Sequence, residues 1–291
     1  MSSSGLITIN FQIMTNDNKQ QKLSDSTDTA IAYSTCCVQC GDNLELLKSQ
    51  PNESVNMIYC DILYGTGRNF GDYQDLKPVR SEIESHYLPR LIEMKRVLKQ
   101  NGSIYLQMDT RINHWMRILM DDVFGYENFR NEIVWCYSTA STPHIKQFPK
   151  NHDVILWYSK SNKWVFNKDF IREPFKNGKP NGGSKWLKEN ETLKEWRNKQ
   201  ANKGKIPFDW ICDVYKVGTS KENSKYPTQK PKELISRLVL ASTNEGDVVA
   251  DYYLGSGTTA VVCKELNRKF IGCDINSKAI KMTKDRLNAV T

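Results

Sequence analysis

Residues 248–259 read Val-Val-Ala-Asp-Tyr-Tyr-Leu-Gly-Ser-Gly-Thr-Thr, and this stretch decides the fold. Residues 248–250 predict a short buried strand, and a helix is expected over residues 258–266. Gly255 and Gly257 lie in the turn between them, where a Cβ would block the backbone conformation and the close approach of a ligand. The helix start offers unpaired N–H groups and a positive dipole end, so the turn predicts a ligand site.

The next predicted strand, residues 269–273, ends at Asp274. An acid about 20 residues beyond a glycine turn, at the tip of a strand, can accept both hydroxyls of a ribose, which predicts a nucleoside-cofactor site. Asp251 lies inside the turn and suits a positively charged amine on an amino-acid-like cofactor. Two other interpretations stay open: a dinucleotide fingerprint, Gly255-x-Gly257-x-x-Ala260, and a tight turn without a ligand. Only about one βαβ unit follows the turn, whereas a dinucleotide fold builds two halves onward from it.

The composition is that of a folded chain with one large or two modest domains: 291 residues, 39% hydrophobic and 10% aromatic. No apolar run approaches about 18 residues, so no membrane span is expected, and no signal peptide is visible at the start. The eight cysteines lack the spacing of a disulfide framework. Cys37-x-x-Cys40 has no second pair at metal spacing, so cysteines in or beside a strand are favoured over zinc and no metal is expected. A reducing, cytoplasmic setting is expected.

The net charge of +8 is concentrated in one segment. Residues 138–225 hold 18 lysines and arginines against nine acids, while the rest of the chain holds 23 against 24. This imbalance predicts a polyanionic partner, with a solvated lysine-rich surface as the alternative. Five of the seven tryptophans lie in the same segment, which suits phosphate contact combined with stacking: Trp157, Trp164, Trp186, Trp196 and Trp210. Trp157 is expected in the core.

A second motif follows a strand in the first half of the chain. Residues 1–35 are polar and predict a tail or irregular arm. A short strand from residue 36 ends at Gly41-Asp42, a helix is expected over 43–49, and residues 55–60 predict a buried strand. That strand delivers Asp61-Ile62-Leu63-Tyr64 to its carboxyl tip, the edge where open α/β sheets bind ligands. A capping aspartate and a packed tyrosine remain the alternative.

The remaining periodicity alternates helices with strands. Helices are predicted over 82–99, 111–121 and 231–243, and strands over 103–108, 131–137 and 154–158. Pro89 should kink or break the first helix, Asn101-Gly102 should stop it, and the last two strands are expected to be antiparallel. This alternation predicts an α/β fold with a mostly parallel sheet covered by helices on both faces.

Three motifs in this order resemble the β group of DNA amino-methyltransferases. Asp61-x-x-Tyr64 resembles their D-P-P-Y motif, and Tyr226-Pro-Thr-Gln-Lys-Pro231 resembles the segment before their cofactor strand. Residues 251–259 resemble their D-P-F-x-G-S-G-T-T loop. The resemblance covers about residues 36–287 and is weakest over 138–225.

The resemblance implies S-adenosylmethionine as the cofactor. The residues that it places at the cofactor are Asp42, Thr228, Lys230, Asp251, Gly255, Ser256, Gly257, Thr258 and Asp274. Asp274 would bind the ribose and Asp42 would lie near the adenine, because in a circularly permuted chain the first strand follows the Asp274 strand in the fold. Asp61 and the Ile62 carbonyl would accept the target amine N–H groups, and Tyr64 would stack on the flipped base.

The implied fold is a doubly wound, Rossmann-like methyltransferase fold. Residues 36–137 would form its catalytic half and residues 226–291 its cofactor half. Residues 138–225 would form a target-recognition insertion whose first strand belongs to the sheet. Duplex DNA is the expected partner, and the resemblance also suggests a homodimer and a cognate restriction endonuclease.

The sequence departs from the family pattern at its catalytic motif. Ile62 and Leu63 replace both prolines of D-P-P-Y, and Tyr252 replaces the proline after Asp251. Proline would stiffen the loop, so preorganisation is in question while the carbonyl acceptors survive. Methylation of the adenine N6 amine is the hypothesis. The alternatives are N4-cytosine methylation, an RNA methyltransferase and a non-catalytic DNA-binding homologue.

Overall fold

A computed structural model describes residues 36–69, 74–138, 146–175, 192, 195, 199, 202–218 and 220–290. The predicted polar tail, residues 1–35, and two of the tryptophans, Trp186 and Trp196, lie outside the described residues. The predicted helices and strands that the description covers all exist, with ends that differ by a few residues.

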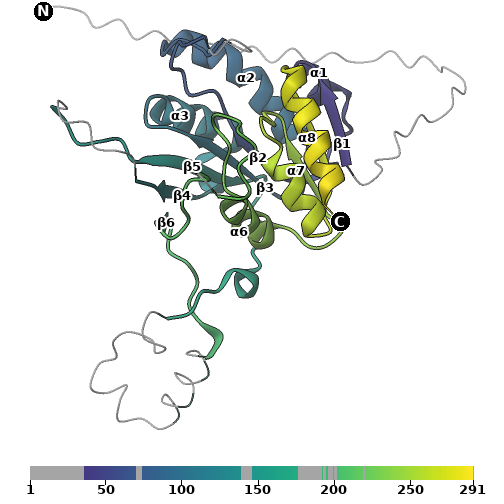
Figure 1. Ribbon diagram of the computed structural model, residues 1–291. Coiled ribbons are helices and arrows are strands. Elements are labelled where there is room, and N and C mark those ends of the chain that lie inside the picture. The colour runs from purple at the N-terminus through teal and green to yellow at the C-terminus, as the bar shows by residue number, and fades with distance from the viewer. Residues whose placement is uncertain are drawn as a thin grey trace, which may run out of the picture. The chain divides into compact units, whose positions relative to one another are not determined.

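The described chain is built on one eight-stranded sheet in the order β1-β8-β7-β2-β3-β5-β4-β6 (Figure 1). The first five strands in this order run parallel. The strand β5 is antiparallel to β4, as predicted, and it is also antiparallel to β3. The strands are β1 Cys36–Cys40, β2 Val55–Asp61, β3 Leu98–Met108, β4 Phe129–Cys136, β5 His152–Ser159, β6 Trp210–Ile211, β7 Val248–Asp251 and β8 Lys269–Asp274.

The first strand pairs with the last, which confirms the permuted arrangement. Cys40 of β1 lies opposite Asp274 of β8 in a parallel ladder. Parallel strands place their carboxyl ends at the same edge, so the polar residues that follow β1, β8, β7 and β2 meet there. This edge is where the site is found.

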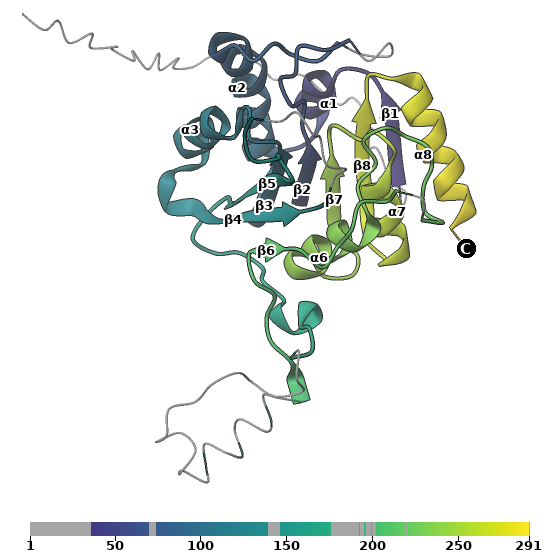
Figure 2. The same cartoon turned by 60° about the vertical axis from the view of Figure 1, so that its left-hand side comes forward.

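Helices cover both faces of the sheet (Figure 2). One face carries α1 Asn43–Ser49, α2 Arg80–Val97 and α3 Asn113–Phe124, and the other carries α6 Lys232–Ser242, α7 Thr258–Glu265 and α8 Ser277–Ala289. Alternate side chains of β2 enter the two cores, with Ile58 on the first face and Met57 and Tyr59 on the second. Two short 3-10 helices, Tyr126–Asn128 and Lys168–Ile171, are also present. No helix of the described residues has the length and apolarity to span a membrane.

Three details differ from the sequence-based predictions. The helix α2 continues through Pro89 without a break, because buried side chains on both sides of the proline, Tyr87 and Leu91 among them, hold it against the sheet. The strand β3 begins at Leu98, so Asn101-Gly102 lies within it rather than ending the helix. The helix α8 was not predicted.

Candidate active site

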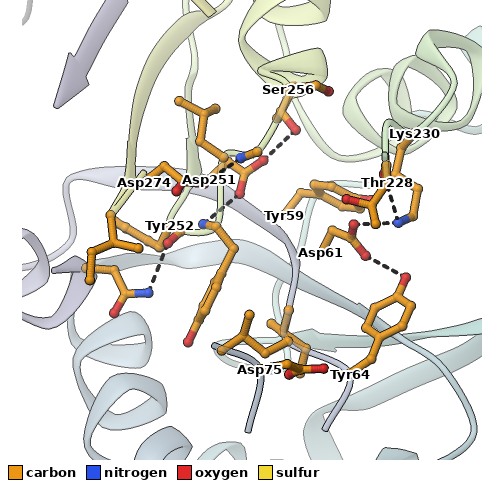
Figure 3. Close-up of a pocket in the computed structure, with 18 of the residues that line it drawn as sticks. Tyr59, Asp61, Tyr64, Asp75, Thr228, Lys230, Asp251, Tyr252, Ser256 and Asp274 are labelled. Atoms are coloured by element: carbon orange, nitrogen blue, oxygen red, sulfur yellow. Dashed lines mark hydrogen bonds and ion pairs between the residues drawn. The ribbon is translucent and has the colours of Figure 1, made fainter. Parts of the chain in front are cut away.

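Four strand ends surround one cavity of about 490 Å³ at the carboxyl edge of the sheet. Asp42 follows β1, and Asp61, Asp251 and Asp274 end β2, β7 and β8. All four carboxylates line the cavity, and the last three face it from neighbouring strands in Figure 3. Its volume is in the range of cofactor sites in proteins.

The glycine turn between β7 and α7 forms one wall of the cavity. Gly255 has a φ of +52°, and its N–H donates a 2.8 Å hydrogen bond to Asp274 Oδ2. A Cβ on Gly255 would lie 3.3 Å from the Tyr226 ring, which also lines the cavity. Gly257, with a φ of +75°, is not among the lining residues; a Cβ there would lie 2.3 Å from Thr283 Oγ1 of α8. Gly255 therefore faces the ligand space, whereas Gly257 permits helix packing.

The hydroxyl groups of the turn connect it to the predicted Thr-Gln-Lys-Pro segment. Ser256 and Thr258 line the cavity, and their hydroxyl oxygens lie 3.1 Å apart. Thr258 Oγ1 also donates to the Lys230 carbonyl at 3.1 Å. Thr228 lines the same cavity, so this segment packs against the start of α7 as a second wall.

Asp251 is a buried carboxyl at the base of the turn. It is 2% exposed and accepts hydrogen bonds from Thr259 Oγ1 at 2.7 Å and from the Tyr253 N–H at 3.0 Å. Burial raises the pKa of Asp251 to about 7. A cationic group bound beside Asp251 would stabilise its carboxylate. The sequence-based expectation is that the amine of the cofactor is this cationic group.

The two outer carboxylates differ in their partners. Asp274 accepts from the Gly255 and Asn276 N–H groups, both at 2.8 Å, and burial raises its pKa. Asp42 caps α1 through the Leu44 N–H at 2.7 Å and forms an ion pair with Arg90 at 3.0 Å. The backbone holds Asp274, and a buried guanidinium holds Asp42, so both carboxylates have fixed positions.

Asp61 binds two side chains from different parts of the chain. The Tyr64 hydroxyl donates to its Oδ1 at 2.8 Å, and the Lys230 ammonium forms an ion pair with its Oδ2 (Figure 3). Burial raises the pKa of Asp61, and the charge of Lys230 opposes that rise. The sequence predicted Lys230 as a cofactor contact, and the structure places its ammonium on the predicted catalytic carboxylate.

The loop after β2 is fixed although both prolines are replaced. The Ile62 N–H donates to the Gln107 carbonyl at 3.0 Å, and the Ile62 side chain is 3% exposed in the core. The Tyr87 hydroxyl donates to the Leu63 carbonyl at 3.1 Å. Asp75, which is buried, accepts hydrogen bonds from the backbone N–H groups of the two residues that follow Tyr64. These are Gly65 at 3.2 Å and Thr66 at 2.7 Å. Packing and hydrogen bonds thus supply the rigidity that proline would give.

Sequence reasoning missed a buried polar cluster behind Tyr64. Asp153 at the start of β5 is 3% exposed, and Gln107 of β3 is fully buried. Gln107 Nε2 donates to Asp153 Oδ2 at 2.9 Å, and the Tyr137 hydroxyl donates to Asp153 Oδ1 at 2.8 Å. The available signal was a charged residue immediately before the apolar run of β5, but this signal did not show its partner Tyr64 in the loop after β2.

The basic segment presents aromatic rings both in the core and at the surface. Trp157 is 9% exposed and stacks on Tyr105 at 5.4 Å between centroids, which confirms its predicted place in the core. Trp210 is 53% exposed and stacks on Phe208 at 5.2 Å, and Lys205 Nζ lies 4.0 Å from the Phe208 ring centroid. Exposed stacked rings beside a cation are suited to a polyanionic partner.

Seven cysteines are free thiols in the described part of the chain, Cys37 and Cys40 among them. Within those same residues no group of three or more His, Cys, Asp or Glu side chains is placed to hold a metal ion.

The fold is that of the Rossmann-like methyltransferases. The cytosine-N4-specific PvuII DNA methyltransferase superposes with a TM-score of 0.61 at 18% identity, over 87% of this chain and 86% of that one. The M1.HpyAVI–SAM complex superposes with a TM-score of 0.57 at 20% identity, over 87% of this chain and 99% of that one. A family model described as DNA methylase matches residues 55–285, and the chain belongs to this family.

Two curated relatives are similar over most of their length. The type II methyltransferase M.HpaI of Haemophilus parainfluenzae is 33% identical, over 86% of this chain and 73% of the relative. The DNA adenine methyltransferase YhdJ of Escherichia coli K12 is 32% identical, over 86% of this chain and 82% of the relative. The chain is therefore a DNA methyltransferase, and DNA is the partner on which it acts.

Proposed function

We propose that the protein transfers a methyl group from S-adenosylmethionine to the N6 amine of adenine at a specific site in duplex DNA. The observation that carries the proposal is one cavity that holds two sets of groups. Asp251 and Asp274 line it on the side of the glycine turn, and the Asp61–Tyr64 pair lines it on the side of β2. A cofactor and a target base brought to these two sets would meet inside the same cavity.

The residues present fit S-adenosylmethionine. The cavity is walled by a turn where a Cβ on Gly255 would press on the Tyr226 ring, so the absent side chain leaves room for a ligand. Asp251 would hold the amine of the methionine part, Asp274 the ribose hydroxyls, and the neighbourhood of Asp42 the adenine. When bound, the cofactor supplies an electrophilic methyl group. Ser256, Thr258 and Thr228 would complete the cradle through their oxygen atoms.

The target base would meet Asp61 and Tyr64. An exocyclic amine is a poor nucleophile because its lone pair is delocalised into the ring. Asp61 and the Ile62 carbonyl would accept its two N–H groups, which favours a more tetrahedral nitrogen with its lone pair directed at the methyl group. Tyr64 would stack on the flipped base. Much of the rate would then come from holding the reacting atoms in line.

Adenine is preferred over cytosine on two grounds. The catalytic motif begins with aspartate rather than serine, which is the adenine pattern of the family, and a relative at 32% identity is named an adenine methyltransferase. N4-cytosine methylation uses the same geometry and remains the second candidate. Residues 138–225 would read the target site between a catalytic half, 36–137, and a cofactor half, 226–291. A homodimer, a cognate restriction endonuclease and a cytoplasmic setting belong to the same proposal.

A radiolabelled-methyl assay on genomic DNA that lacks prior modification tests the function. After digestion to nucleosides, we expect the label in N6-methyldeoxyadenosine. Label in N4-methyldeoxycytidine would select the second candidate, and label in RNA alone would reject DNA as the substrate. No incorporation into any duplex, with S-adenosylmethionine still bound in calorimetry, would identify a non-catalytic homologue.

A further inference from the structure

A second buried carboxylate, Asp153, lies within hydrogen-bond distance of the Tyr64 hydroxyl, as Asp61 does. The Tyr64 oxygen is 2.8 Å from Asp61 Oδ1 and 2.8 Å from Asp153 Oδ2. Asp153 is held in place from two other directions, by Gln107 on Oδ2 and by Tyr137 on Oδ1. Tyr64 therefore bridges two acids on strands β2 and β5 whose positions are fixed independently.

A tyrosine hydroxyl carries one proton, so it donates to only one of these carboxylates at a time. If both acids are ionised, the Tyr64 oxygen faces a second anionic oxygen without a proton between them, which is repulsive in a buried site. One additional proton removes this conflict, because the protonated acid donates to Tyr64 while Tyr64 donates to the other acid. The Asp61–Tyr64–Asp153 chain therefore has a place for one additional proton.

We propose that this chain is a proton path for methyl transfer. Asp153 acts through Tyr64 as a positioning residue and receives the proton that Asp61 takes from the target amine. The inference rests on the proposed function, because it requires an amine at Asp61. It adds a second acid that the sequence motif does not contain.

The proton balance of the path is complete without a further reactant. A methylated amine nitrogen carries one proton in excess; its N–H electron pair stays on nitrogen and the proton bonds to Asp61. The proton on Asp61 then bonds to the Tyr64 oxygen as the Tyr64 proton bonds to Asp153 Oδ2. The Asp61 carboxylate and the Tyr64 hydroxyl are restored, and Asp153 carries the proton. The half-buried Tyr137 hydroxyl on Oδ1 is the next group in the outward direction.

Other titratable groups also act on Asp153. Lys216 is the basic residue beside Tyr137, with its ammonium 3.5 Å from the ring centroid, and Lys230 is the basic residue paired with Asp61. The groups that interact with Asp153 are Asp61, Tyr59 and Tyr64 from β2 and its loop, Asp109 after β3, Tyr137 after β4 and Lys216 after β6. Of these acids, Asp61 and Asp153 are the two that the Tyr64 hydroxyl contacts.

Carbon-13 NMR titration of the Asp61 carboxyl in the free protein tests the coupling without cofactor or DNA. Asp153→Asn should lower the pKa of Asp61, because a like charge is removed. Tyr64→Phe should raise it, because a hydrogen-bond donor to the carboxylate is removed. These opposite signs are not expected from general loosening of the site. An Asp61 pKa that is unchanged or raised in Asp153→Asn would overturn the inference.

A second tyrosine–aspartate pair provides matched controls. The Tyr158 hydroxyl donates to Asp121 Oδ1 at 2.5 Å, and neither residue lines the cavity. Tyr158→Phe and Asp121→Asn delete the same kinds of group elsewhere in the fold. Both should leave the Asp61 pKa unchanged, and a shift equal to that in the test variants would contradict a direct coupling.

Single-turnover methyl transfer tests the path itself. Asp153→Asn and Tyr64→Phe should each slow the chemical step about tenfold to a hundredfold, with cofactor affinity within about twofold of the original. The double variant should be no slower than the slower single variant, because both changes interrupt one path. If the rate losses of the two single variants multiply in the double variant, the proposed proton path is overturned. If the original protein transfers no methyl group, the proposed function fails, while the titration result still stands on its own.

Discussion

At the scale of single residues, the carboxylates of the site differ in the groups that they contact. Asp61 contacts a lysine and a tyrosine, Asp251 contacts a threonine hydroxyl and one backbone N–H, and Asp274 contacts backbone N–H groups. Lys230 bridges the two sides of the cavity, since its carbonyl accepts from Thr258 while its ammonium pairs with Asp61. Substitutions at these acids should therefore have separable effects.

Asp61→Ala should slow methyl transfer severely and leave cofactor binding nearly intact. Loss of a charged acceptor at the reacting nitrogen should cost about 3 kcal/mol or more in the transition state, roughly a hundredfold in rate. Asp274→Ala should show the reverse pattern, with weakened cofactor binding in calorimetry. Methylation of adenine by Asp61→Ala at the rate of the original protein would contradict the assigned role.

Asp251 should make cofactor affinity depend on pH. Its pKa of about 7 falls when a cationic amine binds, so binding should release a proton and tighten as the pH rises from about 6 to about 8. In the free protein the same raised pKa means that the free energy of unfolding decreases as the pH rises from about 4 to about 7, because the folded state holds the proton more tightly. Calorimetry in two buffers with different ionisation enthalpies measures the release. An Asp251→Asn protein with the same pH dependence would exclude Asp251 as its source.

At the scale of elements, the loop after β2 and the turn before α7 obtain their rigidity in different ways. The β2 loop is fixed by Asp75 and by the burial of Ile62, and the α7 turn is fixed by glycines with positive φ. The sequence could not show that Asp75 would replace the prolines, because the contact depends on how the loop folds back on itself.

Proline at position 62 should destabilise the protein more than proline at position 63. Ile62→Pro removes the N–H that donates to the Gln107 carbonyl, a loss of about 1 to 3 kcal/mol for a buried acceptor. Thermal unfolding of Ile62→Pro and Leu63→Pro compares the two positions. Equal stability of both variants would mean that this hydrogen bond contributes little.

Gly257→Ala should destabilise the protein more than Gly246→Ala. Both glycines have a positive φ, +75° and +79°, so alanine incurs backbone strain of about 1 to 2 kcal/mol at either position. A Cβ at Gly246 meets no atom within 4 Å, whereas at Gly257 it would lie 2.3 Å from Thr283 Oγ1. Denaturant unfolding measures the difference, and equal losses would show that α8 moves aside at no cost.

At the scale of the whole molecule, charge and exposed aromatic rings distinguish the inserted segment from the sheet that carries the cavity. Among the described residues of the segment, Lys203, Lys216 and Lys221 are exposed, and Trp210 and Phe208 form an exposed stack. The same charge imbalance was visible in the sequence. The structure adds which of these side chains are available to a partner.

DNA affinity should fall steeply with salt, and the dependence should come from residues 138–225. Replacing Lys203, Lys216 and Lys221 by glutamine should lower the slope of log affinity against log salt by up to about 3. The control replaces three exposed lysines outside the segment, Lys269, Lys281 and Lys284, which removes the same charge. Fluorescence titration at several salt concentrations measures the slopes. If the control variant lowers the slope of log affinity against log salt by the same amount, DNA binding does not depend specifically on this segment.

The sequence by itself determined the elements that depend on near neighbours. The apolar run of β7, the glycine turn and the acid ending β8 are local patterns, and the alternation of such units specified the α/β class. The permuted order was implied by the order of the three motifs that resemble the β group of DNA amino-methyltransferases. The continuation of α2 through Pro89 was not foreseen, because packing against the sheet outweighed a local preference. Trp157 was placed correctly because it lies inside an apolar run.

Only the tertiary structure decided which side chains meet at the reacting centre. Lys230 and Asp61 are 169 residues apart in the chain, and Asp153 and Tyr64 are 89 apart. Such contacts depend on which strands become neighbours and in what register, and no local pattern encodes the partner of a given polar side chain. The sequence could therefore predict the carboxylates at the strand ends, while the lysine and the second acid around Asp61 followed only from the order of strands in the sheet.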